Sequence, residues 1–139
     1  MSSNLVLIDT SAWVRFFDPK AYGEPYVADE VERLILADMA CYTEPVYLEI
    51  AVGAKTEANL RKFQRNFSAL PVMTVCEQHI WAKAADNYLY IVKKGFRKKA
   101  MDILIATVAQ VYDLVLFHHD GDYKTIARAI ALNQYSFLE

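Results

Sequence analysis

The sequence contains few of the residues that mark disulfide-rich, fibrous or linker-divided proteins. Its 139 residues include only two cysteines, four glycines and four prolines. Cys41 and Cys76 are too few for a disulfide framework or a zinc site, and since each lies in an apolar stretch, both are expected to be buried free thiols. No linker rich in glycine, proline or serine divides the chain, so one domain spanning residues 1–139 is predicted.

A long hydrophobic run is absent as well. Hydrophobic residues make up 55% of the chain, enough for a core, yet no uninterrupted run approaches the roughly 18 residues of a transmembrane helix. The apolar run near the N-terminus has no basic segment before it and is interrupted by Asp9, which argues against a signal peptide. We therefore expect a cytoplasmic protein that does not associate with a membrane.

Positive charge does not exceed negative charge overall, but it is concentrated in one segment. The net charge is −2, which alone disfavours a nucleic-acid partner. Residues 93–99, KKGFRKK, nevertheless hold five positive charges. Such a run is compatible with nucleic-acid binding and equally with a solvated loop, so charge alone leaves both interpretations open.

Short apolar runs alternate with longer segments of helical pattern. The predicted strands are Leu5–Ile8, Ala40–Thr43, Pro71–Val75, Leu114–His118 and a short Tyr135–Leu138. The predicted helices are Ser11–Phe17, Tyr26–Asp38, Pro45–Ala54, Glu57–Phe67, Glu77–Lys93, Met101–Tyr112 and Tyr123–Leu132. This alternation predicts an α/β fold, a three-layer α/β/α sandwich with a central, mainly parallel sheet of four to five strands. In such sheets, ligands bind beyond the carboxyl ends of the strands.

Four acidic residues are placed where they would border that edge. Asp9 directly follows the first strand, and Asp120 follows Leu114–His118. Glu49 projects from a largely apolar helix face, where a carboxylate is costly unless it is paired or bound to a cation. Asp102 begins the most apolar helix, where the helix dipole favours a negative charge. Each acid has an ordinary structural explanation when taken alone, as a cap or an exposed side chain.

Together, four carboxylates at one edge would repel one another, and a divalent cation would relieve that repulsion. Ligands that are all oxygen favour Mg²⁺ or Mn²⁺ over zinc. Such an ion activates a bound water and stabilises phosphate oxygens, so the chemistry indicated is phosphodiester hydrolysis. Asp122 is predicted first as the N-cap of the helix beginning near Tyr123 and second as an outer metal ligand.

Four motifs occur in a particular order along the chain. They are IDTS at residues 8–11, P-x-x-x-E-x-x-x-G at 45–53, M-D-x-L-I-A at 101–106 and H-D-x-D-Y at 119–123. This order, from Asp9 to Tyr123, resembles the PIN-domain family, and more narrowly the VapC-type toxin ribonucleases of toxin–antitoxin pairs. The resemblance implies a metal-dependent endoribonuclease whose catalytic, metal-binding residues are Asp9, Glu49, Asp102 and Asp120.

The resemblance also assigns neighbours of these acids. Thr10 and Ser11 are implied as hydroxyl companions of Asp9 that contact the substrate. His118 departs from the family, which commonly has a threonine or serine two residues before the fourth acid. Its ring either contacts metal or phosphate or turns outward. His118 and His119 point to opposite faces of a strand, which argues against a shared zinc ion.

Nucleic-acid binding becomes the favoured interpretation of the basic run, because the run leads directly to Asp102. Lysine and arginine side chains bind phosphates without regard to sequence, so this run is predicted to position RNA through Lys94, Arg97 and Lys98. Trp13 and Phe16 have helical spacing and are expected to pack in the core. Tyr123 is left open between base stacking and core packing.

The resemblance implies an RNA substrate, a homodimer and a cognate antitoxin protein that lies in an apolar groove. The helical segments Val14–Phe17 and Tyr26–Leu36 are apolar enough to supply such a groove. An alternative is a catalytically silent module of the same fold that binds RNA or protein. The occupied acid positions favour the enzyme. A DNA nuclease is disfavoured because the chain has no room for the insertions that such enzymes carry.

Overall fold

A parallel sheet lies at the centre of the molecule. The structure, a computed structural model, describes residues 4–138. Strands β1 (Val6–Ile8), β2 (Ala40–Cys41), β3 (Val115–Phe117) and β4 (Gln134–Tyr135) pair in the order β2-β1-β3-β4, and every pairing is parallel. All three residues of β1 are buried, as expected for a strand covered on both faces.

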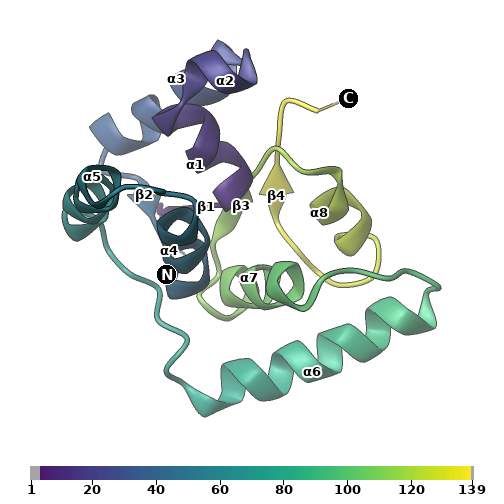
Figure 1. Cartoon of the computed structure of the whole chain (residues 1–139). Helices are drawn as coiled ribbons and strands as arrows, with labels where there is room; N and C mark the ends of the chain where they lie inside the picture. Colours follow the sequence, from purple (N-terminus) through teal and green to yellow (C-terminus); the bar gives the residue numbers. More distant parts are fainter. Residues whose placement is uncertain (1–3, 139) are drawn as a thin grey trace.

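Helices cover the sheet on both faces. Between β1 and β2 lie α1 (Thr10–Phe17), α2 (Pro19–Tyr22) and α3 (Pro25–Leu36). Between β2 and β3 lie α4 (Glu44–Val52), α5 (Glu57–Ser68), α6 (Gln78–Lys93) and α7 (Ala100–Val111), and α8 (Gly121–Ile126) precedes β4. Because these crossovers run in opposite directions along the sheet, right-handed connections place α1 and α3 on one face and α7, with α6 outside it, on the other (Figure 1). Helix α5 packs against α1 through Phe67 and Trp13. The predicted three-layer α/β/α sandwich with a mainly parallel sheet is confirmed.

Helix α7 is the most buried helix, because apolar residues occupy its whole circumference. The long helix α6 packs along it as an outer layer (Figure 1). Buried Asn87 joins the two helices, since its amide donates to Thr107 Oγ1 at 2.9 Å and to Gln110 Oε1 at 2.7 Å. Within residues 4–138, no helix has the length and hydropathy that a membrane span requires.

Aromatic rings anchor α1 immediately after β1. Trp13 is fully buried, stacks on Phe17 with ring centroids 5.7 Å apart and meets the edge of Phe67 at 5.0 Å. Phe16 packs edge-on against Trp13 at 5.9 Å. The predicted core packing of Trp13 and Phe16 is therefore confirmed, and it holds the first turn of α1 in place.

Two predicted elements are wrong in whole or in part. Pro71–Val75 is not a strand, since only Val72 forms a bridge, with Tyr42. Pro71 has no N–H to donate, and Val72 is 44% exposed at the edge of the sheet. The helix predicted at Tyr123–Leu132 begins earlier, at Gly121, and ends at Ile126, beyond which the N–H groups of residues 128 and 129 form tight turns to residues 125 and 126.

Three smaller differences concern the bounds of the last strand, one short helix and one cysteine. The last strand is Gln134–Tyr135 rather than Tyr135–Leu138, and the short α2 was not predicted. Cys41 is a buried free thiol, as predicted, and burial raises its pKa to about 12. Cys76 is exposed, so the prediction that both thiols are buried is wrong for this residue.

Candidate metal centre

Asp9 lies at the carboxyl end of β1, where its backbone still belongs to the sheet. Its N–H donates to Phe117 O at 2.9 Å, which continues the pairing of β1 with β3. Its side chain caps α1, because Oδ2 accepts from Ser11 N at 3.0 Å and from Ser11 Oγ at 2.7 Å. The residue is only 4% exposed, so its carboxylate is held on a rigid part of the fold.

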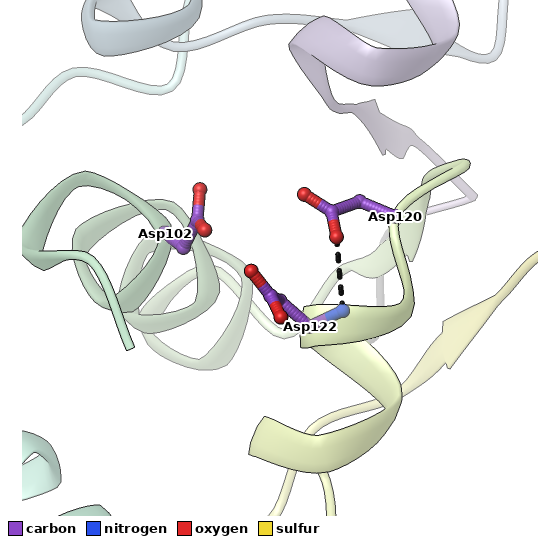
Figure 2. A group of neighbouring side chains, drawn as sticks. All are labelled: Asp102, Asp120 and Asp122. Carbon is purple, nitrogen blue, oxygen red and sulfur yellow. Dashed lines mark hydrogen bonds between the residues drawn. The ribbon is translucent and has the colours of Figure 1, made fainter. Parts of the chain in front are cut away.

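Three further carboxylates meet beside it. Ligand oxygens of Asp102, Asp120 and Asp122 lie within 4.8 Å of one another. Figure 2 shows Asp102 facing the other two across a common space, from the first turn of α7. Asp120 caps α8, because its Oδ1 accepts from Asp122 N at 2.9 Å. The prediction that Asp122 is the N-cap is therefore wrong, and its carboxylate is left to join the group.

Tyr123 connects Asp9 to this group. Its hydroxyl donates to Asp9 Oδ1 at 2.7 Å and lies 3.4 Å from Asp102 Oδ1. The ring is fully buried, so of the two open interpretations core packing holds and base stacking is excluded. Burial and the nearby carboxylates raise the pKa of Tyr123 well above its usual value, and the phenol therefore keeps its proton as a donor.

Glu49 is held by the residue that follows Asp9. Thr10 Oγ1 donates to Glu49 Oε1 at 2.6 Å, which ties α1 to α4. Ser11 Oγ donates to Asp9 and accepts from His119 N at 2.8 Å. The two hydroxyls thus have acids as their partners, which makes them residues that position carboxylates. Glu49 also lines a cleft of about 550 Å³ between α1, α4 and α5.

We call Asp9, Glu49, Asp102, Asp120 and Asp122 the acidic cluster. Burial, the largest cause, and the negative charges of Asp9, Asp120, Asp122 and Glu49, in that order, together raise the pKa of the Asp102 carboxyl to about 7. All four therefore act on Asp102 electrostatically. A divalent cation would remove this repulsion, and the donor atoms are carboxylate oxygens, the type that Mg²⁺ and Mn²⁺ prefer. The residues present thus fit such an ion.

His118 is fully buried and turns neither to the metal position nor to solvent. Its Nδ1 accepts from Asp120 N at 3.2 Å, and its Nε2 lies 2.6 Å from Gln134 Oε1, so these partners assign a proton to Nε2. Burial lowers the pKa of the ring, which keeps it neutral. The predicted contact of His118 with substrate is contradicted by this burial. The ring instead holds the Asp120 backbone and packs against Tyr123 with centroids 5.1 Å apart.

The basic run reaches the acidic cluster at one point. Lys98 Nζ lies 2.8 Å from Asp122 Oδ1, and Lys98 is itself partly buried. Lys94, at the C-cap of α6, and Arg97 are exposed. The structure therefore brings Lys98 to the cluster and leaves Lys94 and Arg97 exposed.

A second polar group was not recognised in the sequence. His119 pairs with Glu24, and Arg15 Nε lies 3.1 Å from the same carboxylate. The hydrogen bond from Arg15 lowers the pKa of Glu24. These contacts join α1, the start of α3 and the segment after β3. The only signal in the sequence was the pair of adjacent histidines, whose side chains point in different directions.

Comparison with known proteins agrees with this fold. The PIN domain matches residues 6–129. VapC ribonuclease Mb1587 of Mycobacterium bovis and Ribonuclease VapC11 of Mycobacterium tuberculosis are each 33% identical over 136 residues, an alignment that covers 96% of this chain and 99% of the relative. The chain belongs to the PIN-domain family, and within it to the VapC group.

Solved structures show the same fold. A chain of VapBC2 from Rickettsia felis, bound to a promoter DNA fragment, aligns with a TM-score of 0.77 at 17% identity and covers 96% of this chain and 99% of its own length. A chain of DNA-bound VapBC from Salmonella typhimurium aligns with a TM-score of 0.75 at 19% identity, and the alignment covers 99% of this chain and 100% of the Salmonella chain. Since the identities are this low, the likeness concerns the fold.

Proposed function

We propose that this protein is a metal-dependent endoribonuclease and the toxin of a toxin–antitoxin pair, acting in the cytoplasm. Membership of the VapC group supports the reaction, since the relatives compared above are named ribonucleases. The observation that carries the proposal is the arrangement around Asp102. Four other acids act on one buried carboxyl, whose pKa is raised to about 7. Their mutual repulsion destabilises the ionised cluster when no cation is bound, and the same negative charges would attract and hold a cation.

In this proposal Asp9, Glu49, Asp102 and Asp120 bind Mg²⁺ or Mn²⁺, and Asp122 is an outer ligand. A bound ion would supply an activated water and stabilise the charge on phosphate oxygens. Ser11 and Tyr123 orient Asp9, and Thr10 orients Glu49, through the hydrogen bonds described above. Such partners fix the direction of the ligand lone pairs, which is why their loss commonly weakens metal sites.

The basic run is proposed to position the RNA strand. Lys94 and Arg97 are exposed, and Lys98 lies against Asp122. A phosphate bound by these side chains would be close to the carboxylates, because Lys98 belongs to both groups. Such contacts add affinity without base specificity.

The antitoxin is proposed to lie in the cleft of about 550 Å³ beside Glu49. Its apolar lining includes Val14 and Phe17 of α1 together with Phe63 of α5, while Glu49 stands at its polar side. The cleft includes the first of the two segments expected to supply a groove, and its other walls come from α4 and α5 instead of α3. A homodimer, which the family resemblance implies, belongs to the same proposal.

Cleavage of a mixed RNA pool by purified, partner-free protein tests the enzyme. The assay is run with Mn²⁺, with Mg²⁺ and with EDTA, beside Asp102→Asn and the control Asp29→Asn, an exposed acid of α3. We expect metal-dependent cutting by the wild type and by Asp29→Asn, with none by Asp102→Asn. If wild type and Asp102→Asn both bind RNA and neither cuts it, the protein is a binding module. Equal cutting by all three would also contradict the proposal.

A further inference from the structure

A second hollow lies next to the acidic cluster, where α6 ends and the chain turns toward α7. Its volume is about 450 Å³, and its lining is Tyr88, Val92, Gly95, Phe96, Arg97 and Lys98. Pockets for small ligands commonly have volumes of about 300–1,000 Å³. The hollow adjoins the cluster because Lys98, which lines it, also bonds to Asp122 at 2.8 Å. We call it the loop pocket.

The turn that forms the loop pocket has a defined shape. Gly95 has a φ of 86°, a left-handed conformation that glycine adopts without strain. Phe96 N then donates to Ile91 O at 3.1 Å, which folds the chain back on α6. The Arg128 guanidinium lies 5.3 Å from the centroid of the Phe96 ring. One aromatic ring of the pocket is thus already in contact with a cation, whereas Tyr88 is 51% exposed and available to a ligand.

The charge around the loop pocket has one sign. None of its lining residues is acidic, and residues 93–99 hold five positive charges. Of these five, Lys98 alone forms an ion pair with a described residue. An occupant that satisfies both the exposed ring and the unpaired cations has a flat π face and flanking negative charges. Single-stranded nucleic acid combines these, since bases stack on aromatic side chains while phosphates meet lysine and arginine.

We propose that the loop pocket binds one nucleobase of the RNA substrate, stacked on Tyr88, with Arg97 and Lys98 on the adjoining phosphates. This inference rests on the proposed ribonuclease function, because it concerns the strand that leads to the acidic cluster. Tyr88 then becomes a positioning residue, which places the phosphate on the acids without touching the reacting atoms.

A protein partner would use a different surface. On the other side of Tyr88 a hollow of about 380 Å³ lies between α6 and α7, and its lining is almost wholly apolar: Trp81, Ala84, Ala85, Tyr88, Ala100, Met101, Ile103 and Leu104. An apolar partner there would leave the other four charges of residues 93–99, those besides Lys98, without a described ion pair. The charged side of Tyr88 therefore favours the nucleotide.

The test measures RNA binding apart from cleavage. Tyr88→Ala, Tyr88→Phe and Tyr90→Ala are each made in the Asp102→Asn background. Tyr90 is a suitable control because it is 57% exposed on the same helix and does not line the pocket. Binding is followed with single-stranded RNA containing 2-aminopurine, whose fluorescence falls when the base stacks.

We expect Asp102→Asn alone to quench the probe. Tyr88→Ala should remove most of the quench and weaken binding about tenfold, while Tyr88→Phe and Tyr90→Ala keep both. In the active protein, Tyr88→Ala should raise KM by a similar factor and leave kcat unchanged. Circular dichroism melting of Tyr88→Ala should match the parent, since the side chain is exposed.

Three results would overturn the proposal. The first is equal quenching by Tyr88→Ala and its parent. The second is a loss of quench and RNA binding in Tyr90→Ala as large as that in Tyr88→Ala. The third is a change in the sedimentation of Tyr88→Ala with RNA binding unaltered, which would make the pocket a protein contact. If the wild type fails to cut RNA yet the quench still depends on Tyr88, the base pocket stands while the nuclease proposal fails.

Discussion

The acidic cluster and the basic run of residues 93–99 lie side by side, yet they are built in opposite ways. Among the acids, Asp9, Glu49 and Asp120 each accept a hydrogen bond of 3.0 Å or less from a residue that the fold holds in place. In the basic run, most side chains are exposed and Lys98 is the member with a described ion pair. The cluster therefore has a fixed geometry suited to chemistry, and the run has exposed charge suited to binding phosphates along a strand.

This difference separates the effects that substitutions should have. Loss of a group that acts only in the transition state lowers kcat, whereas loss of uniform binding raises KM. Changes in the acidic cluster should therefore act on metal binding and kcat. Changes in the basic run should act on KM and on the salt dependence of binding.

The largest expected effect concerns the stability of the metal-free protein. The pKa of the Asp102 carboxyl is about 7 in the folded chain and near 3.8 in the unfolded one, so the folded state holds an extra proton between these values. Stability in EDTA should therefore fall as pH rises from about 4 to about 7. At about 1.4 kcal/mol per pH unit, the loss is at most about 4 kcal/mol. Urea unfolding at several pH values measures it.

Asp102→Asn is the control for that loss, because the amide does not ionise. The variant should be more stable than the wild type above pH 7 in EDTA, and the two should converge toward pH 4. Added Mn²⁺ should restore the stability of the wild type at pH 8 but should not stabilise the variant. If the stability of the two proteins depended on pH in the same way, the surroundings of Asp102 would not raise its pKa.

A large effect is also expected from the charge of Asp9. Asp9→Asn removes the charge, and its single amide oxygen can keep the N-cap bond from Ser11 N but cannot also accept from Tyr123. Loss of a partner that only orients a ligand costs about 10–100-fold, so loss of a ligand should lower kcat by more than about 100-fold. Asp18→Asn, which changes the cap of α2 in the same way outside the cluster, should keep full activity in the same RNA cleavage assay. Similar losses in both would assign the effect to capping.

A smaller effect is expected from Tyr123→Phe. The variant keeps the buried ring and loses the hydroxyl that donates to Asp9 at 2.7 Å. We expect Mn²⁺ affinity to fall about tenfold, as measured by calorimetry. Tyr135→Phe removes a comparable hydrogen bond, to Glu30 at 2.6 Å, and should leave Mn²⁺ affinity unchanged. An unaltered affinity in Tyr123→Phe would show that Asp9 does not need the Tyr123 hydroxyl to bind the ion.

The smallest effect belongs to the basic run. Arg97→Ala should raise KM by roughly threefold with kcat unchanged, and lower the slope of log affinity against log salt by about 0.7, the value for one phosphate contact on a single strand. Lys83→Ala removes an exposed cation of α6 near Asp113 and Asn133 and should change neither. A fall in kcat for Arg97→Ala would mean that Arg97 acts in the chemical step. It would contradict the claim that the basic run affects binding alone.

The strand-end acids could be predicted from sequence because their signals are local. Leu5–Ile8 is a short apolar run that ends at Asp9, and the run ending at His118 is followed by Asp120. Parallel strands then bring both acids to one edge whatever the rest of the chain does. The positions of β1 and β3, and the gathering of the acids, followed from this.

Contacts between distant residues could not be predicted in this way. Tyr123 reaches Asp9 across 114 positions of the chain, and Gln134 turns His118 inward from the neighbouring strand β4. Pro71–Val75 has strand-like residues, but a strand needs a partner along its length, and only Val72 finds one. Such outcomes depend on packing between elements and leave no local pattern.

The central claim is that the acidic cluster is a metal centre, and calorimetric titration of Mn²⁺ into metal-free protein at pH 7 tests it most directly. The account predicts saturable binding to the wild type with release of protons, because the cation displaces protons from a carboxyl whose pKa is about 7. Asp102→Asn should bind at least about 100-fold more weakly. A wild type that binds no Mn²⁺, or a variant that binds it equally well, would contradict the account.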